Sequence, residues 1–90
     1  MRRIEYGSAF KKDYKRMVKR GASMPKLNAV LELLMNDEKL PARNRPHLLS
    51  GEWKGFWECH IEPDWLPVYD LDDPAVCALH RTGTQSDLFE

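Results

Sequence analysis

The chain has ninety residues, of which 42% are hydrophobic and 31% charged, a composition typical of one small globular domain spanning residues 1–90. No apolar run approaches the roughly 20 residues that a membrane-spanning helix needs, and the N-terminus, MRRIEY, lacks the apolar stretch of a signal peptide. Cys59 and Cys77 form no CxxC pattern. We therefore expect reduced sheet cysteines in a cytoplasmic protein, with a disulfide or metal site as the alternative.

The formal net charge of +0 conceals a strong asymmetry along the chain. From Arg2 to Arg20 there are eight basic and two acidic residues, a net charge of +6. From Trp57 to the end there is one basic residue against eight acidic ones, a net charge of −7. A basic half on a neutral protein suggests a face that binds a polyanion, and a solvated amphipathic helix is the alternative.

The first forty residues predict a short strand followed by two helices. Residues 2–6 alternate polar and apolar side chains, as a strand does. Ser8 is a suitable N-cap for a helix that starts at Ala9 and stops at Gly21, with an apolar stripe formed by Phe10, Tyr14, Met17 and Val18. Ser23 caps a second helix that runs to about residue 38, and residues 40–46 read as a loop.

From Trp53 onward the apolar period changes from 3.6 to 2, which predicts strands over residues 53–62, 65–71 and 75–82. The short connections between them favour an antiparallel meander, and the residues after Thr82 read as a short tail. The predicted fold class is α+β, an antiparallel sheet with a helical hairpin packed on it, in the order β-α-α-β-β-β.

Four polar side chains near the predicted strand ends form a set with a chemical meaning. Taken one at a time, His60, Asp64 and Arg81 have ordinary structural explanations, whereas His47 is predicted to lie in a loop between Pro46 and Leu48 with no obvious packing reason. Together they supply what cleavage of a phosphodiester through the ribose 2′-OH requires: a base, an acid and a fixed cation beside the non-bridging oxygens. The sequence has no HExxH motif and no ligand spacing typical of zinc sites, so a mechanism without metal or cofactor is favoured.

Three segments resemble the YafQ branch of the RelE/ParE toxin superfamily. They are HLLSGEWKG from His47, HIEPDW from His60 and RTGTQSDLF from Arg81. The resemblance covers essentially the whole chain and implies the toxin of a bacterial type II toxin–antitoxin pair. Such toxins bind the ribosomal A site and cut mRNA there, and a DinJ/RelB-type antitoxin neutralises them. It also implies a higher-order toxin–antitoxin complex that binds operator DNA through the antitoxin.

The resemblance implies roles for individual residues. Arg81 would steady the scissile phosphate, His60 and Asp64 would transfer protons, and His47 would be a second acid–base or positioning group. Phe89 would stack on a base, and Trp65 is interpreted as a core residue. Ribosome contacts would come from basic residues, namely Lys11, Lys12, Lys15, Arg16, Lys19, Arg20 and Lys54. The same basic surface is suited to an acidic antitoxin segment.

Gln85 departs from the family pattern, which has histidine at this position. Glutamine forms hydrogen bonds but does not transfer protons near neutral pH. Three explanations stay open: a substitution that permits expression of a toxic protein, a natural variant whose acid–base chemistry lies in His47 or His60, and a degenerate toxin that only binds. The alternative to an endoribonuclease is accordingly a non-cleaving protein of the same fold that binds antitoxin or inhibits DNA gyrase.

Overall fold

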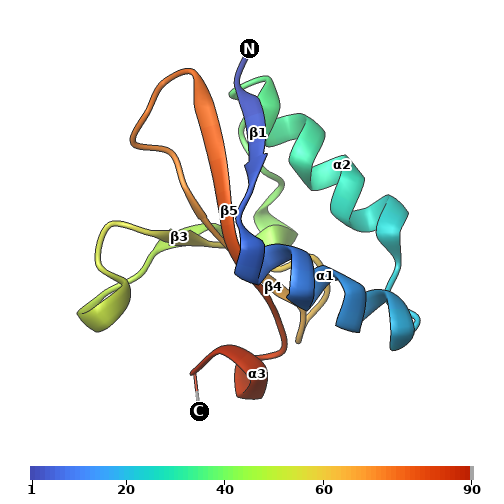
Figure 1. Cartoon of the computed structure of the whole chain (residues 1–90). Helices are drawn as coiled ribbons and strands as arrows, with labels where there is room; N and C mark the ends of the chain where they lie inside the picture. The colour runs from blue at the N-terminus through green and yellow to red at the C-terminus, as the bar shows by residue number, and fades with distance from the viewer. Residues whose placement is uncertain (90) are drawn as a thin grey trace.

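The computed structural model describes residues 1–89, which form a five-stranded sheet and three α-helices (Figure 1). The strands are β1 (Arg3–Tyr6), β2 (His47–Leu48), β3 (Trp57–Glu58), β4 (Leu66–Asp70) and β5 (Val76–Gly83). The α-helices are α1 (Ser8–Lys19), α2 (Met24–Met35) and α3 (Gln85–Phe89), and two 3-10 turns, η1 (Ala42–Asn44) and η2 (Gly51–Trp53), flank β2. The predicted α+β class is confirmed.

The strands lie in the order β1-β5-β4-β3-β2. Neighbours from β2 to β5 are antiparallel, as the short connections predict. β1, however, pairs in parallel with β5, so that Arg3 lies opposite Val76 and the sheet is mixed rather than wholly antiparallel. A parallel partner is possible here because the two helices separate β1 from the other strands and act as the crossover.

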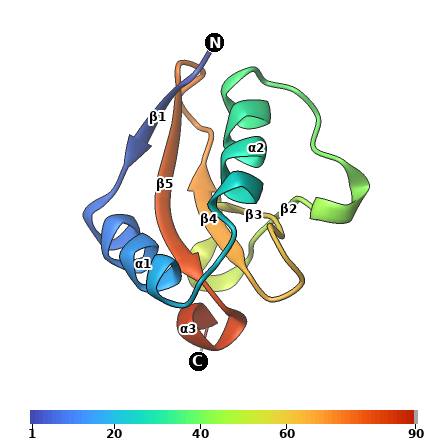
Figure 2. The same ribbon diagram turned by 90° about the vertical axis from the view of Figure 1, so that its right-hand side faces the viewer.

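Both long helices pack against one face of this sheet. In Figure 1 they lie to one side of β5 while the β2–β3 connection extends on the other side, and Figure 2 gives the perpendicular view. The main core joins side chains of α1, α2 and the sheet, including Phe10, Leu27, Leu31, Tyr69 and Leu79. A second, smaller core contains Leu66, Val68 and Leu88, the last from α3.

The junction between β1 and α1 depends on Gly7, which was not identified as important from the sequence. Gly7, rather than the predicted Ser8, is the N-cap residue of α1. Its N–H donates to the carbonyl of Leu79 at 2.9 Å, and a Cβ built on Gly7 would lie 2.9 Å from that same oxygen. Only glycine allows the backbone to approach β5 this closely.

The predicted strand over residues 53–62 is wrong. The extended conformation covers only Trp57–Glu58, and η2 precedes it. Gly55 adopts φ +94, a left-handed conformation that interrupts the alternation of faces. As a result Trp53 packs with Phe56 in the smaller core, while Trp57 packs against the main core. His47, predicted to lie in a loop, is in β2.

The predicted tail is also wrong, because residues Gln85–Phe89 form α3. Asp87 anchors this helix to α1: its carboxylate accepts hydrogen bonds from Arg20 at 2.6 and 3.2 Å and from the Thr84 N–H at 2.9 Å. Thr84 Oγ1 in turn accepts the Asp87 N–H, which completes a reciprocal cap. The Arg20 guanidinium and these bonds hold the pKa of Asp87 far below its usual range.

The buried carboxylate of Asp13 joins α1 to β5. It accepts hydrogen bonds from Arg81 Nε at 2.6 Å, from Arg81 Nη2 at 3.3 Å and from the Thr82 N–H at 3.1 Å. Arg16, one turn along α1, donates to the same carboxylate. Thr82 Oγ1 is fully buried and accepts the Trp65 indole N–H at 2.9 Å, so the interpretation of Trp65 as a core residue is confirmed.

Neither cysteine forms a disulfide, and both are buried. Burial raises the pKa of the Cys59 thiol to about 12 and that of Cys77 to about 11, so both are neutral packing residues near physiological pH. None of the helices within residues 1–89 has the length and apolar character needed to cross a membrane.

Replacing Asp13 should destabilise the fold. We expect Asp13→Asn to lower the free energy of unfolding by about 3 kcal/mol, because the amide leaves two arginines without their charged partner. Urea denaturation followed by circular dichroism measures this change. Asp72→Asn, at an exposed position, is the matched control. A loss for Asp13→Asn no larger than that of the control would contradict the assigned role.

Asp87 should make the stability depend on pH in the acid range. Its pKa is lowered in the folded state, so the carboxylate contributes stability above its unfolded value of about 3.9. That contribution is lost as the pH falls below about 4 toward the folded pKa. In the Asp87→Asn variant, stability should therefore fall less steeply as the pH is lowered below about 4. Thermal unfolding temperatures at a series of pH values measure this dependence. A dependence that is the same in the variant would show that other carboxylates dominate.

Candidate functional site

The two predicted catalytic histidines lie together at one edge of the sheet. The ring centroids of His47 and His60 are 6.4 Å apart, with an angle of 31° between the ring planes. His47 is on the edge strand β2, where it lies opposite Glu58 of β3, and His60 follows β3 by two residues. The β2–β3 pairing therefore brings together two residues that are thirteen positions apart in sequence.

The backbone of His60 is fixed by Asn44 at the end of η1. The His60 N–H donates to the Asn44 carbonyl at 2.6 Å, and the Asn44 Nδ2 donates to the His60 carbonyl at 2.7 Å. Asn44 is buried, so this contact is shielded from water. Sequence reasoning assigned Asn44 only to a loop and missed its part in placing the histidine.

The ring nitrogens of both histidines have defined partners. His47 Nε2 lies 3.1 Å from Glu58 Oε1 and its Nδ1 lies 3.0 Å from the Arg45 carbonyl. His60 Nδ1 lies 3.1 Å from the Pro63 carbonyl and its Nε2 lies 3.4 Å from Arg45 Nη2. Glu58 is buried, whereas His47 is half-exposed and accessible to a ligand. Arg45 and Glu58 were not among the predicted site residues.

Asp64 and Gln85 form a second group of predicted site residues. Asp64 Oδ1 accepts the backbone N–H of Gln85 at 2.9 Å, so the carboxylate caps the first turn of α3. Asp64 directly follows Pro63, whose carbonyl holds His60. The structure thus places Asp64 beside position 85. The Gln85 side chain is exposed and makes no hydrogen bond within residues 1–89.

Arg81 is held apart from the histidine pair. Arg81 on β5 lies opposite Val68 on β4, and Val68 lies opposite Glu58 on β3. Glu58 in turn lies opposite His47 on β2. Three strand spacings of about 4.8 Å therefore separate the backbones of Arg81 and His47, or about 14 Å. Two of the Arg81 guanidinium nitrogens bind Asp13, a partner that the sequence analysis missed, and this contact raises the pKa of Arg81.

Phe89 packs against Trp53 with ring centroids 6.3 Å apart and an interplanar angle of 83°. It belongs to the smaller core rather than to a free tail. Its predicted role in stacking on a base stays a prediction.

The basic residues predicted to contact RNA differ in their surroundings. Lys11, Lys12, Lys15 and Lys19 are exposed on α1 and form no ion pair within residues 1–89. Lys54, which follows η2, is also exposed. Arg16 and Arg20, in contrast, are bound to Asp13 and Asp87. The four lysines are therefore the available cations of this helix.

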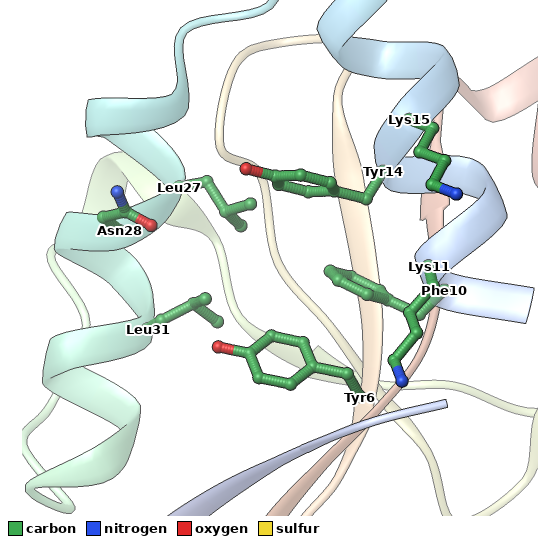
Figure 3. A pocket seen from close by; sticks show the side chains of 8 residues that line it. All are labelled: Tyr6, Phe10, Lys11, Tyr14, Lys15, Leu27, Asn28 and Leu31. Atoms are coloured by element: carbon green, nitrogen blue, oxygen red, sulfur yellow. The ribbon is translucent and has the colours of Figure 1, made fainter. Parts of the chain in front are cut away.

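A groove separates α1 from α2 beside these lysines. Its volume is about 430 Å³, and Figure 3 shows the rings of Tyr6, Phe10 and Tyr14 facing Leu27 and Leu31 across it. Lys11 and Lys15 lie along the α1 side. Tyr14 and Val18, which belong to the predicted apolar stripe, are 37% and 48% exposed, because the buried face of α1 is formed by Phe10, Asp13 and Met17.

In the part of the chain that the structure describes, no three side chains of histidine, cysteine, aspartate or glutamate are grouped so as to hold a metal ion together.

Comparisons with known proteins place this chain in a family. The family model described as "Bacterial toxin of type II toxin-antitoxin system, YafQ" matches residues 2–90. The mRNA interferase toxin YafQ of Escherichia coli K12 is 43% identical over 89 residues, which cover 98% of this chain and 96% of the relative.

Solved structures agree with the sequence match. YafQ from Escherichia coli BL21(DE3) and a histidine-to-glutamine mutant of Escherichia coli YafQ superpose with TM-scores of 0.92 and 0.91, each at 43% identity and covering 100% of both chains. The Escherichia coli DinJ–YafQ complex contains a chain that matches with a TM-score of 0.90 at 42% identity, again covering 100% of both chains. The chain therefore belongs to the YafQ family of bacterial toxins of type II toxin–antitoxin systems.

Proposed function

We propose that this chain, acting as one domain in the cytoplasm, is an mRNA interferase that cleaves mRNA in the ribosomal A site. The observation that carries the proposal is the pair of accessible imidazoles 6.4 Å apart, in a chain 43% identical to an mRNA interferase toxin. Two rings at this separation suit one phosphate, because each has to come within about 2.6–3.2 Å of a different oxygen of the reacting group.

The reaction is attack of the ribose 2′-oxygen on the adjacent phosphorus with loss of the 5′-oxygen. One histidine accepts the 2′-OH proton and the other donates a proton to the departing 5′-oxygen. Arg81, whose backbone lies about 14 Å from that of His47, offers the guanidinium nitrogen that Asp13 leaves free to a neighbouring phosphate of the RNA chain. Asp64 orients the start of α3, where Gln85 offers an amide to hydrogen-bond the substrate and Phe89 offers a ring to a base.

Of the explanations for Gln85, the geometry favours a natural variant whose proton transfer lies in His47 and His60. The two imidazoles already form a pair, whereas the Gln85 side chain is bound to nothing within residues 1–89. The histidine-to-glutamine mutant of Escherichia coli YafQ keeps the fold, so an exchange of this kind is compatible with it. The glutamine at position 85 also supports a second candidate function, namely that of a non-cleaving protein that binds antitoxin.

The partner implied by the Escherichia coli DinJ–YafQ complex is a DinJ-type antitoxin. The groove between α1 and α2 suits one of its segments, since aromatic and leucine side chains form the floor and two lysines the rim (Figure 3). An amphipathic segment with acidic residues beside its apolar face would match both features. The lysines would then serve the ribosome in the free toxin and the antitoxin in the complex.

The unmodified chain should cleave mRNA on ribosomes, and Gln85→His should change the rate by less than about 10-fold. His47→Gln and His60→Gln should each lower it by roughly 10²–10⁴-fold, because each removes an acid or a base. Primer extension on a translated mRNA measures all four proteins, with His80→Gln as the histidine control. Cleavage by the Gln85→His form alone would show that position 85 carries a catalytic proton. Silence from both forms would favour the non-cleaving alternative.

Charge reversal on α1 should weaken ribosome binding. Lys11→Glu, Lys12→Glu and Lys15→Glu should each raise the dissociation constant and reduce its dependence on salt. Each variant loses a phosphate contact, so binding releases fewer counterions from the RNA. Lys39→Glu, an exposed reversal outside α1, is the matched control. Binding to ribosomes over a salt series provides the measurement, and α1 variants with the affinity and salt slope of the control would reject this surface as the RNA contact.

A further inference from the structure

We propose that Arg45, rather than Arg81, supplies the cation beside the scissile phosphate. This assignment rests on the proposed function, because it concerns the reaction at the histidine pair, and it departs from the role that the family resemblance implies for Arg81. Negative charge builds on the non-bridging oxygens as the 2′-oxygen bonds to phosphorus, so the step needs a fixed cation. A guanidinium suits this role, because it stays charged and keeps its protons throughout the reaction.

Arg81 is poorly placed for the phosphate that the histidines would hold. Its backbone lies about 14 Å from that of His47, across the strands between them. Two of its guanidinium nitrogens bind Asp13 at 2.6 and 3.3 Å, and Arg16 donates to the same carboxylate. The position of the Arg81 guanidinium is therefore set by a carboxylate of α1, which leaves one nitrogen for a more distant phosphate.

Arg45 contacts both imidazoles of the pair. Its carbonyl lies 3.0 Å from His47 Nδ1, and its Nη2 lies 3.4 Å from His60 Nε2. An oxygen at hydrogen-bond distance from His60 Nε2, about 2.6–3.2 Å, can therefore lie at a similar distance from Arg45 Nη2. A phosphate that meets His60 is thus within reach of the Arg45 guanidinium.

The Arg45 side chain is also available to bind an anion. It is exposed, and within residues 1–89 the contact with His60 is its one hydrogen-bond partner. The arginines that bind a carboxylate are Arg2, Arg3, Arg16, Arg20 and Arg81. A guanidinium without a carboxylate partner can bind a phosphate through two parallel hydrogen bonds without first breaking an ion pair.

A hollow of about 290 Å³ opens beside His60, and Arg43 and Arg45 are among the residues that line it. The acidic residue of its wall, Glu62, is paired with Lys26 at 3.6 Å. The hollow therefore has an excess of positive charge, which attracts a phosphate to the imidazole that it has to reach.

Tertiary contacts, rather than local preference, place Arg45 beside His60. The Arg45 N–H donates to the Ala42 carbonyl at 3.0 Å, and its φ of +43 is uncommon for a residue other than glycine. Pro46 follows, and proline ordinarily favours an extended backbone in the residue before it. Asn44, the preceding residue, is buried and hydrogen-bonded to the His60 backbone. Backbone strain of this kind concentrates at functional sites.

Replacing Arg45 tests the role through the rate. Arg45→Gln should slow single-turnover cleavage on ribosomes by roughly 10²–10³-fold at saturating toxin, as the loss of one preorganised donor does. Arg45→Lys should recover part of the rate, because the ammonium keeps the charge but not the planar fork. Arg43→Gln, at an exposed arginine of the same hollow, is the matched control and should keep the rate of the unmodified chain. An Arg45→Gln variant that cleaves as fast as this control would overturn the assignment.

A sulfur atom in place of one non-bridging oxygen of the scissile phosphate tests the contact itself. Sulfur accepts hydrogen bonds weakly, so the unmodified chain should cleave one of the two phosphorothioate diastereomers more slowly than the ordinary phosphate. Arg45→Gln should remove this sulfur effect, because the oxygen has already lost its partner, and Arg81→Gln should keep it. A purely structural role for Arg45 predicts slow cleavage with the sulfur effect intact, which would overturn the proposal. An unmodified chain without a sulfur effect would do so as well.

Phosphate binding to the free chain separates this inference from the proposed function. If the unmodified chain and Gln85→His both leave mRNA intact, the proposed function and the catalytic role of Arg45 fall together. Titration with a 2′-O-methylated dinucleoside monophosphate, which carries one uncleavable phosphodiester, then decides whether Arg45 binds phosphate at His60. In ¹H–¹⁵N NMR spectra, the Arg45 Nε–H and the His60 ring signals should shift together, and those of Arg81 should not.

Arg45→Gln should weaken this binding, whereas Arg43→Gln should leave it unchanged. Saturating shifts at His60 without any at Arg45 would overturn the placement of the guanidinium. That comparison needs only the unmodified chain, so it holds even if a variant fails to fold.

Discussion

The buried carboxylate of Asp13 is the interaction on which the arrangement of this small protein depends. It accepts four hydrogen bonds from groups that belong to two elements, α1 and β5. A buried charge is tolerated only when it is paired and fully hydrogen-bonded, so these contacts specify where α1 lies on the sheet. The position of α1 then determines where its side of the groove toward α2 lies. It also determines the place of Arg20, which holds α3 through Asp87.

The candidate site is divided between the two ends of this arrangement. The histidine pair lies on the β2–β3 edge and is positioned by Asn44, Arg45 and Glu58. Arg81 and α3 are bound to α1 and its C-terminal cap through the ion pairs Arg81–Asp13 and Arg20–Asp87. Asp64 connects the two, since it follows the turn that holds His60 and caps the helix that begins at Gln85. An RNA chain that contacts all these groups has to cross the central strands between them.

The sequence was a good guide wherever one local rule decided the outcome. Ser23 caps α2 as expected, and Gly21 follows the end of α1. Sequence patterns failed where a tertiary contact decided. Gly55 interrupts what looked like a continuous strand, and Asp87 makes a helix of residues that carry no helical pattern of their own. Five residues are too few for a periodicity to be recognised.

The same distinction applies to the site. His47, His60, Asp64 and Arg81 were found because their chemistry is unusual near strand ends, and the family resemblance supported them. Their supporting residues were missed, because Asn44 and Arg45 read as loop residues and Glu58 as an ordinary residue of a longer strand. Asp13 alone left a signal: it is a lone carboxylate in a basic helix, spaced i+3 from the buried Phe10 and i−4 from the buried Met17. A charge on the buried side of a helix needs a partner from elsewhere in the fold.

The parallel pairing of β1 with β5 has a consequence for how the protein is made. The first strand finds its partner only when residues 76–79 are available, so the sheet is closed by a contact between opposite ends of this sequence. Contacts so distant in the chain form late and slowly. During synthesis, His47 and His60 are translated before the strand that carries Arg81. The complete site therefore forms only after residues 76–83 have been translated.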